Sequence, residues 1–166
     1  MTVDLRRWKW GRAALGGALL ALAAPPFPPA LIALAMLGAI LLATTLDDET
    51  TLGRALLYGF TFGLATNLVA MSFVPQTITR FTDLPSVVAV TGWVLLSAAQ
   101  GLVWAIAAVV AWGLGRLGVP RALAFAAGVG ASVFVPALVP WTLGGPFARA
   151  PLFLQPAELI RERGMA

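Results

Sequence analysis

The stretch LPSVVAVTGWVLLSAAQGLVWAIAAVVAWGLG, residues 84–115, contains no charged side chain over its whole length. An uncharged apolar run of about 18 residues is already long enough to cross the roughly 30 Å hydrocarbon core of a bilayer as a helix. The stretch therefore predicts a membrane-spanning helix over about 86–114. At about 1.5 Å per residue this helix is longer than the core is thick, so we expect it to tilt or to protrude.

Further uncharged stretches occupy 13–46, 55–79 and 122–148. The prolines between positions 25 and 29 cannot sit inside a helix, so the first stretch divides into two segments joined by a tight turn. The predicted fold class is all-α: a polytopic transmembrane helix bundle with about five hydrophobic helices, the first two forming a short proline-linked hairpin. The expected segments are 12–24, 30–46, 53–74, 86–114 and 121–139, with a polar loop at 76–85.

The composition argues against a soluble globular domain and against several kinds of active site. The chain is 60% hydrophobic and 11% charged, whereas soluble domains carry about 25% charged residues. It contains no Cys and no His, so we expect no thiolate nucleophile, no imidazole base, no metal and no cofactor. The acidic residues all lie outside the predicted spans, which disfavours an ion-coupled transporter. The basic residues lie in short connections, a pattern typical of membrane topology rather than of nucleic-acid binding.

The N-terminus has a second interpretation. Basic residues followed by a short apolar segment also begin secretory signal peptides. Here the apolar sequence resumes after the prolines, so a retained helical hairpin is favoured and a cleaved leader is the alternative.

Small residues mark the places where helices are expected to approach one another closely. Gly59 and Gly63 form a G-x-x-x-G pair in the third segment. Gly128 and Ser132 lie on a small-residue face of the fifth segment. These four positions are the predicted helix-packing residues.

Two amide side chains lie near the middle of predicted spans, Asn67 in the third segment and Gln100 in the fourth. Polar side chains inside a membrane bundle usually hydrogen-bond across helices. We expect that role for both, with contact to lipid or substrate as the lesser alternative.

Lys and Arg near span ends set the orientation of a membrane protein. With five spans and a cytoplasmic N-terminus, the cytoplasmic side carries the larger basic set (Arg6, Arg7, Lys9, Arg12, Arg54, Arg116, Arg121) and the outer side the smaller (Arg80, Arg149, Arg161, Arg163). We therefore predict a cytoplasmic N-terminus. The expected organisation is a helical bundle over 1–140 and an outer-face loop or tail over 141–166 that leads toward a missing sixth span.

Four short stretches carry a resemblance to a known family. They are LALAAPPF at 20–27, GFTFGL at 59–64, TITRFTDLP at 77–85, and VPWTLG at 139–144 followed by Pro151, Gln155, Ala157 and Glu158. In this order the chain resembles the N-terminal membrane region of bacterial apolipoprotein N-acyltransferases. The last stretch is similar to the family's Phe-Pro-Trp-x-x-x-Gly loop, with Val139 in place of the usual Phe.

The resemblance implies a function in lipoprotein maturation in the bacterial inner membrane. Family members continue into further spans and a periplasmic nitrilase-like domain with a Glu-Lys-Cys triad. Its Cys takes an acyl chain from a phospholipid as a thioester and passes it to the α-amine of a lipoprotein. This chain has no Cys, and its single Lys, Lys9, is predicted to be cytoplasmic, so it cannot form the triad. We expect a truncated or split family member that is inactive alone.

Two functional hypotheses follow. In the first, the chain is the membrane part of an N-acyltransferase, with phospholipid, lipoprotein substrates and a separate nitrilase-domain polypeptide as partners. Lipid or substrate contact is then assigned to residues of the outer-face loops (Phe81, Leu84, Pro140, Trp141, Phe147), with interfacial anchoring as the simpler role of the aromatic ones. In the second, the chain is a small non-catalytic membrane protein that assembles with itself or with a larger complex through its small-residue faces.

Overall fold

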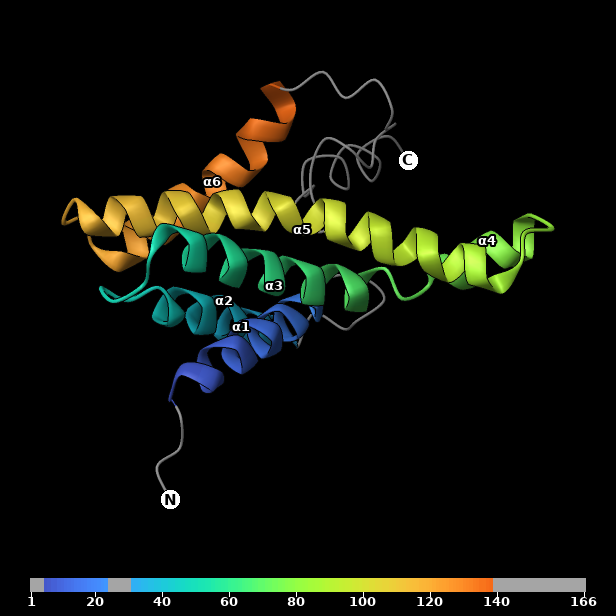
Figure 1. Ribbon diagram of the computed structural model, residues 1–166, viewed down its shortest axis with the longest axis horizontal. Helices are drawn as coiled ribbons and strands as arrows, with labels where there is room; N and C mark the ends of the chain where they lie inside the picture. Colours follow the sequence, from blue (N-terminus) through green and yellow to red (C-terminus); the bar gives the residue numbers. More distant parts are fainter. Residues whose placement is uncertain (1–4, 24–30, 139–166) are drawn as a thin grey trace, which may run out of the picture.

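The computed structural model describes residues 5–23 and 31–138, which form helices joined by short turns (Figure 1). In chain order the helices are α1 (Leu5–Ala21), α2 (Ile32–Thr45), α3 (Leu52–Ala70), α4 (Val74–Phe81), α5 (Ser86–Arg116) and α6 (Arg121–Leu138). The described residues contain no strand, and the all-α prediction is confirmed for them. The predicted tail over 141–166 lies outside the described residues.

Helix α1 begins at Leu5, whereas the sequence predicted a start near residue 12. The first residues are mainly Leu, Arg, Lys and Trp, which are good to moderate helix formers, so the basic segment extends the helix instead of preceding it. Lys9 forms an ion pair with Asp47, and Arg12 donates a hydrogen bond to Thr44. These two contacts hold the first turns of α1 against the C-terminal end of α2.

Helix α1 packs against both α2 and α3, while α2 has little direct contact with α3. Glycines allow the close approach. A Cβ on Gly38 of α2 would lie 2.3 Å from the carbonyl oxygen of Gly16, and one on Gly17 would lie 2.0 Å from the carbonyl oxygen of Phe62 in α3. No side chain fits at these positions, so the helices meet backbone to backbone.

The most extensive contact in the described part of the chain is between α3 and α5, which run antiparallel (Figure 1). A Cβ on Gly59 would lie 2.5 Å from the carbonyl oxygen of Trp104, and one on Gly63 would lie 2.6 Å from the Cβ of Trp104. From the other side, a Cβ on Gly101 would lie 3.1 Å from the backbone nitrogen of Leu64. The G-x-x-x-G pair therefore lies against α5 of the same chain.

Helix α6 packs on the outer side of α5. A Cβ on Gly128 would lie 2.3 Å from the carbonyl oxygen of Ala107 and 3.1 Å from the Cβ of Ala111. Ser132 also belongs to α6, in the part of that helix whose side chains the structure does not describe. The chain thus forms a layered bundle in which α5 contacts both α3 and α6.

Small side chains dominate the interior, and many bulky apolar side chains lie on the outside. Alanines make up most of the buried apolar positions, around a few large groups such as Leu42, Phe62 and Trp104. On the exterior, Met36 is 63% exposed and Leu95 is 64% exposed. Extensive exposed apolar surface is unusual for a soluble monomer and marks contact with a membrane or another protein.

The segment predicted as a polar loop at 76–85 is largely helical. α3 ends at Ala70, and α4 begins a new helix after a bend of 49°. The third segment was predicted to end near Pro75, but α3 ends at Ala70, and Pro75 instead occupies the first turn of α4, where the missing N–H costs nothing. Val74, Ile78 and Phe81 recur at helical spacing, a pattern that the polar composition of the loop obscured.

The prediction of about five spans is not confirmed. Among the described residues, one helix, α5, is long and apolar enough to cross a membrane, and α3 with α4 makes a second if the bent pair counts as one span. α2 and the described part of α6 are apolar but shorter. α1 is interrupted by charge in its first turns. Helix α5 itself matches the prediction, since it spans Ser86–Arg116 where a helix over 86–114 was expected.

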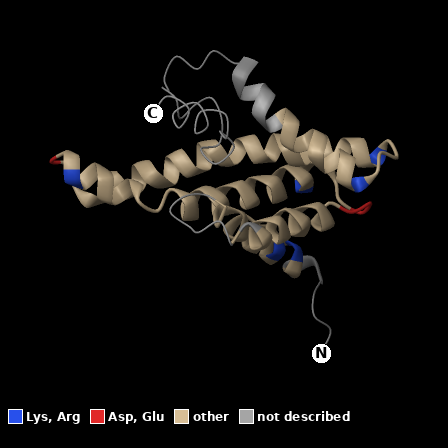
Figure 2. Ribbon diagram, turned by 180° about the vertical axis from the view of Figure 1, so that it is seen from behind, with Lys and Arg blue, Asp and Glu red and all other residues tan. Residues whose placement is uncertain are grey.

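The charged residues lie toward the two ends of the bundle (Figure 2). One end, called here the basic end, brings together the start of α1, the turn between α2 and α3, and the turn between α5 and α6. The opposite end, called the α4 end, consists of α4, the turn at 82–85 and the start of α5. The long apolar faces of the helices lie between them.

Candidate functional site

The α4 end carries the two described residues to which the sequence assigned lipid contact. Phe81, the last residue of α4, is 78% exposed, and Leu84 in the following turn is 48% exposed. Figure 1 shows α4 beside the first turns of α5, in a hairpin that extends beyond α1, α2 and α3. The other three residues of that set, Pro140, Trp141 and Phe147, lie outside the described residues.

The polar hydroxyls of α4 are satisfied within the helix itself. Thr77 donates to the carbonyl oxygen of Phe73 at 3.1 Å, and Thr79 donates to that of Pro75 at 3.0 Å. Such back-bonding to the preceding turn leaves few free donors on the helix surface. What α4 presents is therefore the exposed ring of Phe81 beside the cation of Arg80, an amphipathic surface suited to lipid headgroups.

A layer of buried polar groups lies at the α3–α5 interface. Asn67 and Ser97 are fully buried, and Gln100 is 9% exposed. The antiparallel register set by the glycine contacts places Asn67 at the level of Ser97 and Gln100. The sequence identified Asn67 and Gln100 but missed Ser97, because a single Ser in an apolar helix gives no distinctive signal.

The hydrogen bond of Asn67 differs from the one expected. Its Nδ2 donates to the carbonyl oxygen of Gly63 at 2.8 Å, within α3 and not across to another helix. Among the described residues, neither Asn67 Oδ1 nor Ser97 Oγ has a hydrogen-bond partner. The layer thus retains unused hydrogen-bonding capacity, but it includes no charged group.

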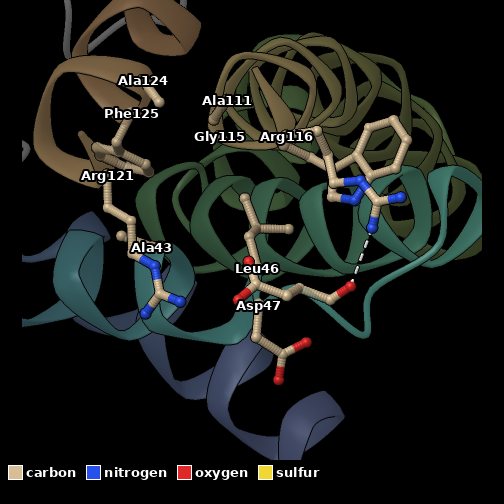
Figure 3. Close-up of a pocket in the computed structure, with 11 residues that line it drawn as sticks. Ala43, Leu46, Asp47, Ala111, Gly115, Arg116, Arg121, Ala124 and Phe125 are labelled. Atoms are coloured by element: carbon tan, nitrogen blue, oxygen red, sulfur yellow. Dashed lines mark hydrogen bonds between the residues drawn. The ribbon is translucent and has the colours of Figure 1, made fainter. Parts of the chain in front are cut away.

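A pocket of about 50 Å³ opens at the basic end, between the ends of α2, α5 and α6 (Figure 3). Its volume suits a few waters or one small polar group and is too small for an acyl chain. Its lining combines charged residues with small and apolar ones: Ala43, Leu46, Asp47, Asp48, Ala111, Trp112, Gly115, Arg116, Arg121, Ala124 and Phe125. In Figure 3, Arg116 and Arg121 approach the pocket from opposite sides.

Two hydrogen bonds from α5 fix the turn between α2 and α3 beside this pocket. Trp112 Nε1 donates to the carbonyl oxygen of Thr50 at 2.7 Å, and Arg116 Nη1 donates to that of Asp48 at 3.1 Å. The Arg116 guanidinium also lies 5.8 Å from the centre of the Trp112 ring. Sequence analysis treated the two arginines only as topology signals, because the pocket joins segments that are far apart in the chain.

The surroundings of the Asp47 carboxylate shift its pKa. Burial by itself raises the pKa of this carboxyl, but hydrogen bonds from Lys9 and Thr50 and the charge of Lys9 outweigh it, so the pKa lies below its ordinary value. Asp47 is therefore ionised and paired at neutral pH. Within the described ranges, no cluster of His, Cys, Asp and Glu could hold a metal ion.

Comparison with known proteins gives one match. The sequence model of the family described as "Apolipoprotein N-acyltransferase N-terminal domain" matches residues 16–165. No curated protein and no solved structure matches the chain significantly.

Proposed function

This chain belongs to the apolipoprotein N-acyltransferase N-terminal domain family, and from that premise we propose that it is the membrane-embedded part of an N-acyltransferase. The family match over residues 16–165 is the observation that carries the proposal. In this role the bundle holds phospholipid and positions a catalytic domain at the outer face of a bacterial inner membrane.

The arrangement of the helices supports membrane embedding. α5 is about 45 Å long at 1.5 Å per residue, which exceeds the roughly 30 Å hydrocarbon core. Bulky apolar side chains are exposed along α5 from Val87 to Ile106, and the charges lie toward the two ends of the bundle. We propose a multi-pass topology in which the basic end, and with it the N-terminus, faces the cytoplasm.

The acyl-transfer chemistry requires a nucleophile that these 166 residues do not supply. The family resemblance assigns that role to a Cys in a nitrilase-like domain, and the sequence has no Cys. We therefore propose that the chain is inactive alone and works with such a domain and with lipoprotein substrates. We assign contact with lipid on the outer face to Phe81 and Leu84, an assignment supported by their exposure at the α4 end.

Complementation tests this proposal. Cells depleted of their own N-acyltransferase receive this chain, a nitrilase-domain protein, or both, and mass spectrometry reads the N-acylation of a lipoprotein. We expect acylation only when both are present. Acylation by the chain alone would contradict its proposed inactivity, and no acylation with any nitrilase-domain protein of the family would contradict the acyltransferase role.

The structure bears on the alternative role as an assembly subunit. That hypothesis used the faces of Gly59, Gly63 and Gly128 for contacts between chains. In the structure these glycines contact α5 of the same chain. The same hypothesis used the face of α6 from Gly128 to Ser132, where a Cβ on Gly130 meets nothing within 4 Å and the side chain of Ser132 lies outside the described residues.

A further inference from the structure

The pocket at the basic end combines features of an anion site with features of a lipid site. It lies where the end of α2, the end of α5 and the start of α6 meet (Figure 3). The α4 end, to which the proposed function assigns contact with lipid on the outer face, is at the opposite side of the bundle. A ligand here would therefore be distinct from the donor lipid.

The two arginines of the pocket differ in how they are held. Arg116 is fixed by its hydrogen bond to the carbonyl oxygen of Asp48 and by the ring of Trp112. Arg121 has no hydrogen bond or ion pair with any part of the chain that the structure describes, and it is exposed. One guanidinium is thus preorganised and the other is free to engage a ligand, a pairing suited to a phosphate group.

The start of α6 adds to the positive potential. Arg121 is the first residue of this helix, whose N-terminal amides carry a partial positive charge. Two acids also line the pocket. The charge of Asp47 is matched by Lys9, which leaves the carboxylate of Asp48 as the opposing charge. With both arginines present, the balance favours an anion.

An apolar row leads away from the pocket along α2. Ala43 lines the pocket, and one and two turns earlier on the same face lie Ile40, which is 54% exposed, and Met36, which is 63% exposed. The phosphate-sized pocket is thus continuous with an uncovered apolar face. A free anion would leave this apolar face exposed, whereas the acyl chain of an amphiphile would cover it.

We infer that the basic end binds an acidic phospholipid, with the headgroup phosphate between Arg116 and Arg121 and an acyl chain along Met36 and Ile40. Basic pockets between membrane helices on the cytoplasmic side commonly hold acidic headgroups. The inference rests on the proposed membrane embedding and orientation, but not on acyl transfer. It assigns the chain a second lipid contact, in the leaflet opposite to the α4 end.

Native mass spectrometry of the full chain in detergent micelles tests the headgroup contact. Phosphatidylglycerol and phosphatidylcholine with the same acyl chains are offered in equal amounts. We expect preferential retention of phosphatidylglycerol, reduced about fivefold by Arg121→Gln, since one basic residue near acidic lipid contributes about that factor. Arg54→Gln, the same change at an exposed arginine of α3 that does not line the pocket, is the matched control and should leave retention unchanged. Equal retention of the two lipids, or equal loss in both variants, would overturn the inference.

A second arm separates a lipid from a free anion. Met36→Ser should weaken phosphatidylglycerol retention, and inorganic phosphate at millimolar concentration should not displace the lipid. Displacement by phosphate, together with no effect of Met36→Ser, would show a plain anion site and overturn the lipid assignment. Circular dichroism confirms that each variant is folded. A chain that stays in membranes yet shows no Arg121 effect would refute this site alone, whereas a chain recovered folded without detergent would refute the proposed embedding.

Discussion

At its C-terminal end α5 is packed and hydrogen-bonded against several helices and turns, whereas at its N-terminal end α4 is the one described helix beside it (Figure 1). Near the basic end, α3 and α6 contact α5 through glycine and alanine, and Trp112 and Arg116 hydrogen-bond to the turn between α2 and α3. Near the α4 end, Val87 is 75% exposed and α4 has no buried residue. The same apolar composition therefore serves helix packing at one end and contact with the surroundings at the other.

The comparison shows how a chain with few polar groups separates these two uses. Where residues are small, backbones come close enough for dispersion contacts and shape to hold the helices together. Many of the bulky apolar residues lie on the outside of the bundle, around a few large buried groups such as Phe62 and Trp104. Side-chain size, more than hydrophobicity, distinguishes the packed from the exposed parts of this molecule.

The largest expected effect comes from filling the α3–α5 contact. Gly59→Leu places a side chain where even a Cβ lies 2.5 Å from the carbonyl oxygen of Trp104, so α3 and α5 must separate. We expect a loss of about 3 kcal/mol or more in unfolding free energy, measured by thermal unfolding in detergent. Gly92→Leu is the matched control, since a Cβ there meets nothing within 4 Å and should leave stability unchanged or slightly higher. Equal effects of the two changes would refute the size argument.

A buried aromatic ring distinguishes the packed end from the exposed end almost as strongly. Phe62→Ala removes a fully buried ring that packs on Trp104, and it should cost about 3–5 kcal/mol. Phe81→Ala removes the same ring from the surface of α4, where it is 78% exposed, and should change the unfolding free energy by at most about 0.5 kcal/mol. Chemical denaturation in micelles measures both. A loss of unfolding free energy for Phe81→Ala as large as that for Phe62→Ala would mean that Phe81 is packed against the rest of the protein.

Two tryptophans of α5 provide a finer contrast. Trp112→Phe deletes the 2.7 Å hydrogen bond to the carbonyl oxygen of Thr50 and should destabilise the bundle by about 1 kcal/mol. Trp93 Nε1 is buried with no hydrogen-bond partner among the described residues, so Trp93→Phe should be neutral or stabilising. Unfolding curves of the two variants, measured under the same conditions, give the difference in their unfolding free energies. If Trp93→Phe destabilised the bundle more than Trp112→Phe, the hydrogen bond from Trp112 would not be the one that anchors the turn.

The smallest expected effect is a pH dependence at the basic end. Folding holds the pKa of Asp47 below its ordinary value, so the folded state binds the proton less readily than the unfolded state. The resulting stabilisation is complete above the ordinary aspartate pKa of about 3.9 and is lost as the pH falls through the lower folded-state pKa. For a partly exposed pair it amounts to at most about 1 kcal/mol. Lys9→Met should flatten this acid limb of the stability curve, and an unchanged limb would rule out the Lys9–Asp47 pair as its cause.

Much of the fold follows from features local in the sequence. Uncharged length predicted α5 almost to its ends, and the prolines at 25–29 correctly separated α1 from α2. α4 was missed because Pro75 was taken only as a helix end, although proline equally suits a first turn. The number of spans is not confirmed for the described residues, because an uncharged run need not form one helix of full membrane length.

The candidate sites were harder to predict, since they depend on which segments meet. Gly59 and Gly63 were identifiable from their spacing alone, but that spacing does not reveal that α5 is their partner. The pocket at the basic end joins Asp48, Trp112 and Arg121, which are far apart in sequence. They come together because the fold brings the ends of α2 and α5 to the start of α6.

Cysteine accessibility tests the membrane embedding most directly, because the chain has no native Cys. Single substitutions Phe81→Cys, Leu102→Cys and Leu117→Cys sample the α4 end, the middle of α5 and the basic end, at positions 78%, 55% and 80% exposed. In intact cells, a membrane-impermeant maleimide should label F81C and leave L117C unlabelled until the cells are opened, while L102C should resist labelling in either case. Labelling of L102C from water at a rate similar to the other two would contradict a bilayer around α5.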